Sequence, residues 1–142
     1  MRRFGVSTHL FRGERLQQDD LTAIASHGFE AVELFAAKDH FDYHNPAAIQ
    51  ALASWLRNTG REMPSGHAPI GEPAAEITAA LEIARHVPFS RFVLHMPGTS
   101  RDAAIRSIED LHRIAEPLGV TIALEVMDNA LSAVDALLDN GR

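Results

Sequence analysis

Two histidines and a glutamate stand at the ends of three successive strand-like segments. They are His67 in MPSGHAP, His95 in RFVLHMPG and Glu125 in TIALEVMDN, spaced about thirty residues apart. In a parallel α/β sheet, ligands bind outside the carboxyl ends of the strands, and in a barrel that edge carries the chemistry. Because neighbouring strands lie about 5 Å apart, the three side chains can converge on one divalent ion with bonds of about 2.0–2.2 Å.

The sequence around each of these residues supports a position at a strand end. Glu125 interrupts the apolar strand IALEV, where an unpaired carboxylate is costly to bury. It must therefore meet a metal, another cation or hydrogen-bond donors, or lie at the wet end of its strand. His95 precedes a Met-Pro-Gly turn, and His67 lies between Gly66 and Pro69, which shape a tight exit. For both histidines the alternative is a hydrogen bond to a loop.

Three further residues are candidates for contact with a substrate. His9 ends the first strand-like segment, where it could line a pocket or cap the rim. Glu33 interrupts the apolar run AVELF, and it could contact a substrate or orient a ligand histidine. His44 belongs to the polar and aromatic loop 39–44, for which the alternative is a solvated connection to the next helix.

The elements that must position these residues alternate between strands and helices. Strands about one βα repeat apart are predicted at Phe4–His9, Ala31–Phe35, Glu62–His67, Arg91–His95 and Val120–Val126. Amphipathic helices are predicted at Gln17–His27, Asn45–Thr59, Pro73–His86, Arg101–Glu116 and Leu131–Asp139, the last starting from a Ser132 cap. This regular alternation predicts a right-handed parallel α/β fold.

The helix at Asn45–Thr59 has the clearest sequence signals. Asn45 can cap its first turn, Pro46 suits the first helical position, and Gly60 can end it. An apolar stripe with helical spacing runs along it, formed by Ile49, Leu52, Ala53 and Leu56. The stripe predicts that this helix packs against a sheet.

One α/β domain over residues 1–142 fits the length of the chain, and two architectures fit its five βα units. One is a flavodoxin-like open sheet, and the other is the first five units of an eight-stranded barrel. A glycine-rich phosphate loop would favour the open sheet, but none follows any predicted strand. Metal-type residues at the strand ends favour the barrel. The pattern alone leaves both architectures open.

Composition limits the classes of function. The chain has no cysteine, so any metal site must use histidine and carboxylate ligands. Its formal net charge is −6 and it has no run of lysine or arginine, which argues against nucleic acid as a partner. It shows no signal-peptide pattern and no apolar run of about 20 residues, the length of a membrane span. We therefore expect a cytoplasmic protein without a membrane partner.

Six segments along the chain carry a resemblance to a known family. In order they are FGVSTHLF, HGFEAVELF, FDYHNPAA, GHAPI, FVLHMPG and LGVTIALEVMDNALS. Together they resemble the sugar phosphate isomerase/epimerase family of xylose-isomerase-like TIM barrels, which is related in fold to the class II AP endonucleases. The resemblance covers essentially the whole chain and implies a partial TIM-type barrel. It implies that Glu125 is a metal ligand, and that His67 and His95 match the two histidines that share one zinc with this glutamate in the endonuclease branch.

The resemblance also implies a reaction. A divalent metal (Mn²⁺, Mg²⁺, Co²⁺ or Zn²⁺) would polarise the carbonyl of a sugar, a sugar phosphate or a related hydroxy-carbonyl substrate. Glu125 would be a ligand and a candidate base that moves a proton between carbons through an enediolate. The last three βα units of the family, which supply an Asp, one or more His and a final Glu, have no counterpart here. We therefore expect a truncated relative with little or no isomerase turnover on its own.

Two other functions fit the same residues. His67, His95 and Glu125 could form a complete zinc site of an AP-endonuclease-type phosphodiesterase, although the acidic charge and the missing basic stripe count against DNA binding. A non-catalytic partial barrel could instead act as a scaffold. In that case we expect a homo-oligomer in which copies of the chain cover each other's open sheet edges.

Overall fold

The computed structural model describes residues 3–96 and 100–127 of the chain. The strands are β1 (Gly5–Ser7), β2 (Ala31–Phe35), β3 (Glu62–His67), β4 (Arg91–Leu94) and β5 (Thr121–Leu124). The α-helices are α1 (Gln18–Ser26), α2 (Pro46–Thr59), α3 (Ala74–Leu81) and α4 (Arg101–Ala115), with 3₁₀ turns at Thr8–Phe11, Glu82–Arg85 and Glu116–Leu118. The predicted helix Leu131–Asp139 and its Ser132 cap lie outside the described residues. Among the described helices, none has the length and apolar character needed to cross a membrane.

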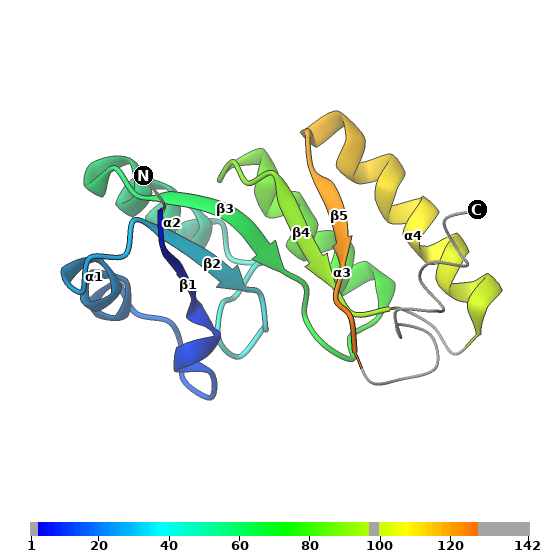
Figure 1. Ribbon diagram of the computed structural model, residues 1–142, viewed down its shortest axis with the longest axis horizontal. Coiled ribbons are helices and arrows are strands. Elements are labelled where there is room, and N and C mark those ends of the chain that lie inside the picture. The colour runs from blue at the N-terminus through cyan, green and yellow to red at the C-terminus, as the bar shows by residue number, and fades with distance from the viewer. Residues whose placement is uncertain (1–2, 97–99, 128–142) are drawn as a thin grey trace.

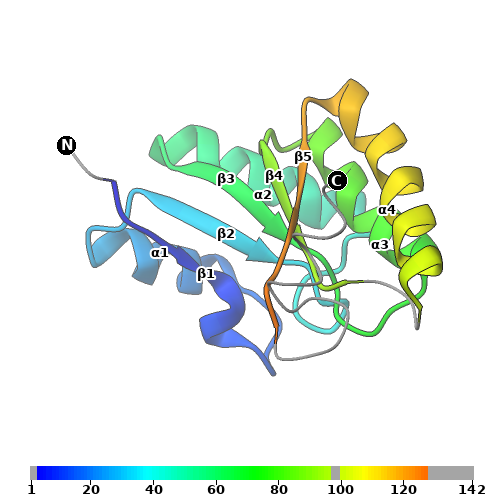
Figure 2. The same ribbon diagram turned by 45° about the vertical axis from the view of Figure 1, so that its right-hand side comes forward.

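The five strands form one parallel sheet in the order β1-β2-β3-β4-β5, which follows the chain (Figure 1). Each connection therefore moves to the next strand in the same direction, so that the helices come to lie on one side of the sheet (Figure 2). A flavodoxin-like sheet instead reverses its strand order and carries helices on both faces. The structure thus confirms the predicted α/β fold: in the described residues, five parallel strands alternate with helices as in part of a TIM-type barrel.

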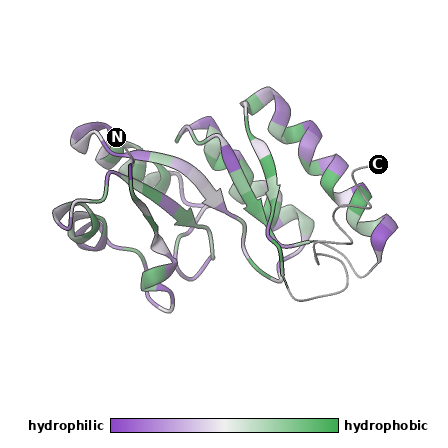
Figure 3. Cartoon of the chain, viewed as in Figure 1, coloured by the Kyte–Doolittle hydropathy of each residue, from purple (hydrophilic) through white to green (hydrophobic). Residues whose placement is uncertain are grey.

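The two faces of this sheet differ in character. On the helix-covered face lie the most deeply buried strand residues, each at most 2% exposed: Val32, Leu34, Phe92 and Leu94. They pack in one core with apolar residues of all four helices, and hydrophobic segments alternate with hydrophilic ones along α4 (Figure 3). We call the other side the open face; it carries Ser7, Glu33, Phe35, Ser65, His67, Arg91, Val93, Thr121 and Ala123, which strand register places side by side.

The first strand is shorter than the predicted segment Phe4–His9. It stops at Ser7, whose side chain accepts a hydrogen bond from the backbone N–H of His9 and caps a 3₁₀ turn. The hydroxyl of Thr8 then accepts the N–H of Phe35 at 2.9 Å. A side chain thereby satisfies a backbone donor at the edge of the sheet, where a longer β1 would have offered a carbonyl.

Helix α2 begins and ends where its sequence predicts. The side chain of Asn45 accepts a hydrogen bond of 3.0 Å from the N–H of Ala47, and Gly60 adopts the left-handed conformation with φ of 64°. The apolar stripe of the helix is buried in the core. Helix α2 is therefore fixed both by its ends and by its packing.

Replacing Asn45 with alanine is expected to lower the free energy of unfolding by about 1 kcal/mol, because the first turn loses its side-chain acceptor. Urea denaturation would measure the change. The matched control is Asn58→Ala at an exposed position of the same helix, where the change should stay within about 0.5 kcal/mol. Equal losses in both variants would contradict the capping role.

Candidate metal centre

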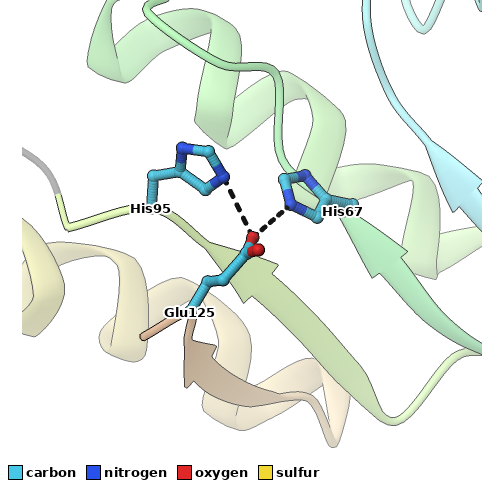
Figure 4. Close-up of side chains that lie close together, drawn as sticks. All are labelled: His67, His95 and Glu125. Atoms are coloured by element: carbon cyan, nitrogen blue, oxygen red, sulfur yellow. Dashed lines mark hydrogen bonds and ion pairs between the residues drawn. The ribbon is translucent and has the colours of Figure 1, made fainter. Parts of the chain in front are cut away.

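His67, His95 and Glu125 meet on the open face at the carboxyl ends of β3, β4 and β5 (Figure 4). The Nε2 atoms of both histidines lie 3.0 Å from Oε2 of Glu125. One donor atom from each residue lies within 4.8 Å of the other two, and no other such group of three occurs among the described residues. Tetrahedral ligands around zinc lie about 3.4 Å apart, so only a small adjustment separates this arrangement from a three-ligand site.

Strand register explains why these three side chains converge. His67 is paired with Val93, and Val93 is paired with Ala123. His95 and Glu125 each lie two residues beyond their strand's member of this row, and side chains two residues apart on a strand share a face. The structure therefore brings together the three residues that the sequence places at strand ends.

The hydrogen bond at Nδ1 of His67 determines what its other ring nitrogen, Nε2, can do. Its Nδ1 lies 2.8 Å from the carbonyl oxygen of Ala68, which can only accept, so Nδ1 carries a proton. In a neutral imidazole Nε2 is then an acceptor, yet it faces a carboxylate oxygen of Glu125 at 3.0 Å. Two acceptors this close require a cation between them, either a proton or a metal ion. A carbonyl at the far nitrogen is also the usual partner of a metal-bound histidine.

The two imidazoles lower the pKa of the Glu125 carboxyl below its ordinary value. The hydrogen bond with His67 is the largest cause, partial burial opposes it, and the charge of the nearby His95 adds to the lowering. The side chain of Glu125 is 44% exposed, against 14% for His67 and 25% for His95. The centre is therefore held by two mostly buried imidazoles and opens to solvent on the glutamate side, where a further ligand can enter.

Several solved structures are similar to this chain, among them the following three. A xylose isomerase domain protein from Planctomyces limnophilus superposes with a TM-score of 0.71 at 19% identity, over 96% of this chain and 57% of its own. A D-psicose 3-epimerase from Clostridium cellulolyticum gives 0.69 at 14%, over 94% and 55%. A 3-keto-D-glucoside 4-epimerase from E. coli gives 0.61 at 14%, over 91% and 64%. The chain has a xylose-isomerase-like fold.

The xylose-isomerase-like fold agrees with the family that the sequence segments resemble. The chain spans 57%, 55% and 64% of the lengths of the three similar proteins. No family model matches the sequence, and no curated protein matches it either. The fold prediction is therefore confirmed, whereas the roles of the site residues stay predictions.

Within the xylose-isomerase-like fold, Phe35 at the end of β2 packs against the candidate metal centre. Its ring contacts three imidazoles, with centroid distances of 4.6 Å to His9, 5.6 Å to His67 and 6.2 Å to His40. His67 contacts His95 in turn, at 5.2 Å. The predicted contact residue His9 thus lies at the same edge of the sheet, separated from the trio by one aromatic ring.

Glu33 lies on the open face beside β3. Its Oε2 accepts a hydrogen bond of 2.7 Å from the hydroxyl of Ser65. The carbonyl of Ala68, and not Glu33, is the partner of Nδ1 of His67. Contact between Glu33 and a ligand remains a prediction.

His44 lies in a separate cluster around Glu76 of α3. Its Nε2 is 2.9 Å from Oε2 of Glu76, which also accepts the Tyr43 hydroxyl at 2.7 Å and lies 3.9 Å from Nζ of Lys38. The hydrogen bond from Tyr43, followed by that from His44, lowers the pKa of Glu76. Burial of the Tyr43 hydroxyl, followed by its bond to Glu76, raises the pKa of that hydroxyl. These contacts tie the loop after β2 to α3. His44 makes no described contact with His67, His95 and Glu125, which we call the metal trio.

The Glu76→Gln variant is expected to lose stability in a pH-dependent way. Because the pKa of Glu76 is lower in the folded protein, its charge stabilises the fold above the unfolded pKa, and this contribution disappears as pH falls through the folded pKa. The variant should melt below the wild type at pH 7, and the difference should shrink as the pH falls below about 4.3, the ordinary pKa of a glutamate. Thermal melts at pH 7 and pH 3 would measure this.

The control for this experiment is Glu82→Gln on the following turn. Among the described residues its carboxylate bonds only to Arg85, at 3.2 Å, and both side chains are about half exposed. Surface pairs of this kind contribute little, so the control should melt close to the wild type at both pH values. A melting difference for Glu76→Gln that persists unchanged at pH 3 would show that its charge is not the cause.

The structure adds a buried polar network that the sequence does not indicate. His40 is 1% exposed and bonds through Nδ1 to the carbonyl of Glu14 at 2.7 Å and through Nε2 to the hydroxyl of Thr8 at 3.1 Å. Thr8, also 1% exposed, holds the N–H of Phe35. The network joins the loops after β1 and β2 behind Phe35. Its partners lie 26 and 32 residues from His40 in the sequence, so the polar loop 39–44 gives no local sign of it.

Proposed function

We propose that this chain binds one divalent ion, Zn²⁺, Mn²⁺, Co²⁺ or Mg²⁺, through His67, His95 and Glu125. The main support is the pair of imidazole nitrogens at 3.0 Å from one Glu125 oxygen, with the other nitrogen of His67 already bonded to a carbonyl. Mixed imidazole and carboxylate donors suit this group of ions. Three protein ligands with a further position open are typical of catalytic rather than structural metal sites.

We further propose a metal-assisted proton transfer on a sugar or a related hydroxy-carbonyl compound. A bound divalent ion supplies a Lewis acid for a carbonyl and its neighbouring hydroxyl. His67 and His95 fix the geometry of the donors, and the exposed glutamate side admits the substrate. The oxygen of Glu125 that does not bind the ion is the candidate base that accepts a proton from carbon.

The similar structures support this class of substrate. One is a D-psicose 3-epimerase solved with D-tagatose, and another is a 3-keto-D-glucoside 4-epimerase. A sugar or sugar phosphate is therefore the small-molecule partner that we propose. The chain spans only 55% and 64% of the lengths of these two proteins. An epimerase activity like theirs is therefore a proposal for this chain.

Calorimetric titration of the metal-stripped chain with ZnCl₂ and MnCl₂ tests the metal site. We expect one bound ion per chain, lost in His67→Ala and in His95→Ala. The matched control is His112→Ala, since His112 is exposed on α4 and its loss should leave the affinity unchanged. A wild-type chain that binds no stoichiometric ion would contradict the proposed site.

Proton transfer is tested separately by NMR in D₂O with D-tagatose as the probe. We expect little or no isomerase turnover from this chain on its own, so the test looks for the first step only: slow replacement by deuterium of the hydrogen next to the carbonyl when the ion is present, abolished in Glu125→Gln. Exchange no faster than with the free ion alone would reject the reaction while leaving the metal site intact.

A second candidate is a metal-dependent phosphodiesterase of the AP-endonuclease type. It is favoured by the trio itself, since two imidazoles and a carboxylate complete a three-ligand zinc site without any further strand. The formal net charge of −6 weighs against binding to DNA. Zinc-dependent cleavage of an abasic duplex, lost in His67→Ala, would replace the isomerase proposal with this one.

A non-catalytic scaffold is the third candidate, and the sheet edges favour it. Among the described strands, β1 and β5 each pair with a single neighbour, and exposed edges pair readily with other chains. Light scattering would test this role: a dimer or larger assembly supports edge pairing, and a well-folded monomer at high concentration argues against it.

A further inference from the structure

A row of polar residues crosses the open face below the metal trio. Register pairs Ser7 with Glu33, Glu33 with Ser65, Ser65 with Arg91 and Arg91 with Thr121, so that all five strands contribute. We call these five residues the polar row. Side chains in register on parallel strands point to the same face, so the row and the metal trio share one surface.

The polar row lies one to two layers from the metal trio, toward the amino ends of the strands. Ser65 precedes His67 by two residues, or about 7 Å along the strand. Arg91 precedes His95 by four residues, or about 13 Å. A small molecule that contacts the trio can therefore extend along the open face as far as the row.

The composition of the row is unusual for this position in the fold. The inside of a TIM barrel is normally packed with bulky branched side chains, whereas this row offers three hydroxyls, one carboxylate and one guanidinium. Glu33 is held by the Ser65 hydroxyl at 2.7 Å. Arg91 is exposed, and no hydrogen bond or ion pair of its side chain occurs among the described residues. In the part of the chain that the structure describes, Ser7, Glu33 and Ser65 are thus half-buried, Arg91 and Thr121 are exposed, and the guanidinium of Arg91 is available to a ligand.

The charges on this surface indicate what a ligand needs. Arg91 on β4 carries a positive charge, and a divalent ion held by two neutral imidazoles and Glu125 leaves a net charge of +1, while the negative charge of Glu33 lies to one side, on β2. A complementary ligand has acceptors that face Arg91 and the ion, and hydroxyl donors on the side of Glu33. The Glu33 and Arg91 backbones are two strand spacings or about 10 Å apart, a distance over which salt screens most of their mutual effect.

We propose that the polar row binds the anionic end of a hydroxylated compound, a sugar acid or a sugar phosphate. Its carboxylate or phosphate accepts from the Arg91 guanidinium, and its hydroxyls bond to Glu33 and Ser65. Its carbonyl end lies at the metal trio, and this last contact alone rests on the proposed function. The arginine side chain covers part of the distance between the two sites, which leaves a length suited to an acyclic five- or six-carbon compound.

Binding of three probes tests this proposal: D-gluconate carries a carboxylate, D-glucose 6-phosphate carries a phosphate, and D-glucitol is neutral. Each is titrated by NMR into the metal-free and the zinc-treated chain, with the wild type, Arg91→Met and Arg113→Met. Arg113 is the matched control, since it is an exposed arginine on α4 bonded to Asp110 at 2.8 Å.

We expect at least one anion to bind the wild type more tightly than D-glucitol, and Arg91→Met to weaken that binding by about tenfold or more. Whichever anion binds identifies the end group. Arg91→Lys should keep part of the affinity, because a lysine retains the charge but not the bidentate geometry. Equal binding of D-glucitol, equal losses in Arg91→Met and Arg113→Met, or no binding of any probe would overturn the proposal.

The zinc titration separates failure of this proposal from failure of the metal site. If the chain binds no zinc, the metal-free arm still reports on Arg91. If zinc binds but Arg91→Met loses no affinity for either anion, the metal site stands and the polar row is not a ligand site.

Discussion

The Glu125→Gln variant is expected to bind zinc at least about 100-fold more weakly than the wild type. Loss of a residue that only hydrogen-bonds to a metal ligand already costs about 10–100-fold in metal affinity. This change removes a proposed ligand itself, the only carboxylate in the trio. The amide that replaces it is neutral and cannot balance the charge of a divalent ion. Competition with a chromogenic chelator at pH 7 would measure the ratio.

Glu109→Gln is the control for this variant, because Glu109 is exposed on the remote surface of α4 and should not affect zinc affinity. Glu125 itself also predicts how the stability of the metal-free protein depends on pH. The lowered pKa of Glu125 means that its charge adds stability above the unfolded pKa, and that this is lost as pH falls through the folded pKa. Zinc affinity unchanged in Glu125→Gln would remove the glutamate from the site.

Replacing Phe92 with alanine is expected to lower the free energy of unfolding by about 3–5 kcal/mol. Phe92 is 1% exposed on the helix-covered face of β4, and its ring stacks on Phe89 with centroids 6.1 Å apart. The substitution leaves a cavity between the sheet and its helices. Domains of this kind are typically stable by only about 5–15 kcal/mol, so the variant should be close to unfolding.

The measurement is chemical denaturation of the wild type and of Phe92→Ala, with Phe4→Ala as the control. Phe4 is 65% exposed, and removal of its ring should change stability by no more than about 0.5 kcal/mol. A similar loss for both variants would mean that the helix-covered face of the sheet is not the tightly packed core.

The sequence was sufficient for the alternation of strands and helices, because caps and apolar stripes are local signals. Asn45 and Gly60 predict the two ends of α2 to within one residue, because the helix runs from the residue after Asn45 to the residue before Gly60. Strand order was not a local signal, since a doubly wound sheet and a barrel are built from the same βα units. The sequential order of the strands, with helices on one face, decided that question.

The convergence of His67, His95 and Glu125 followed from the sequence because parallel strands bring their carboxyl ends to one edge. The contacts of His44 did not follow, because its partner Glu76 lies 32 residues away on α3. The inward position of His40 was hidden for the same reason. Polar residues in loops show their chemistry in the sequence but not the partner that decides their role.

His67 and Glu125 are 58 residues apart in the chain and almost touch in space. An ion bound between them would act as a cross-link that spans two βα repeats, and cross-links over long loops restrict the unfolded chain most. Amide hydrogens of β3, β4 and β5 would then exchange with solvent as one cooperative block, while β1 would fray at its own rate. Occupancy of the centre would in that way divide the molecule into a rigid and a labile half.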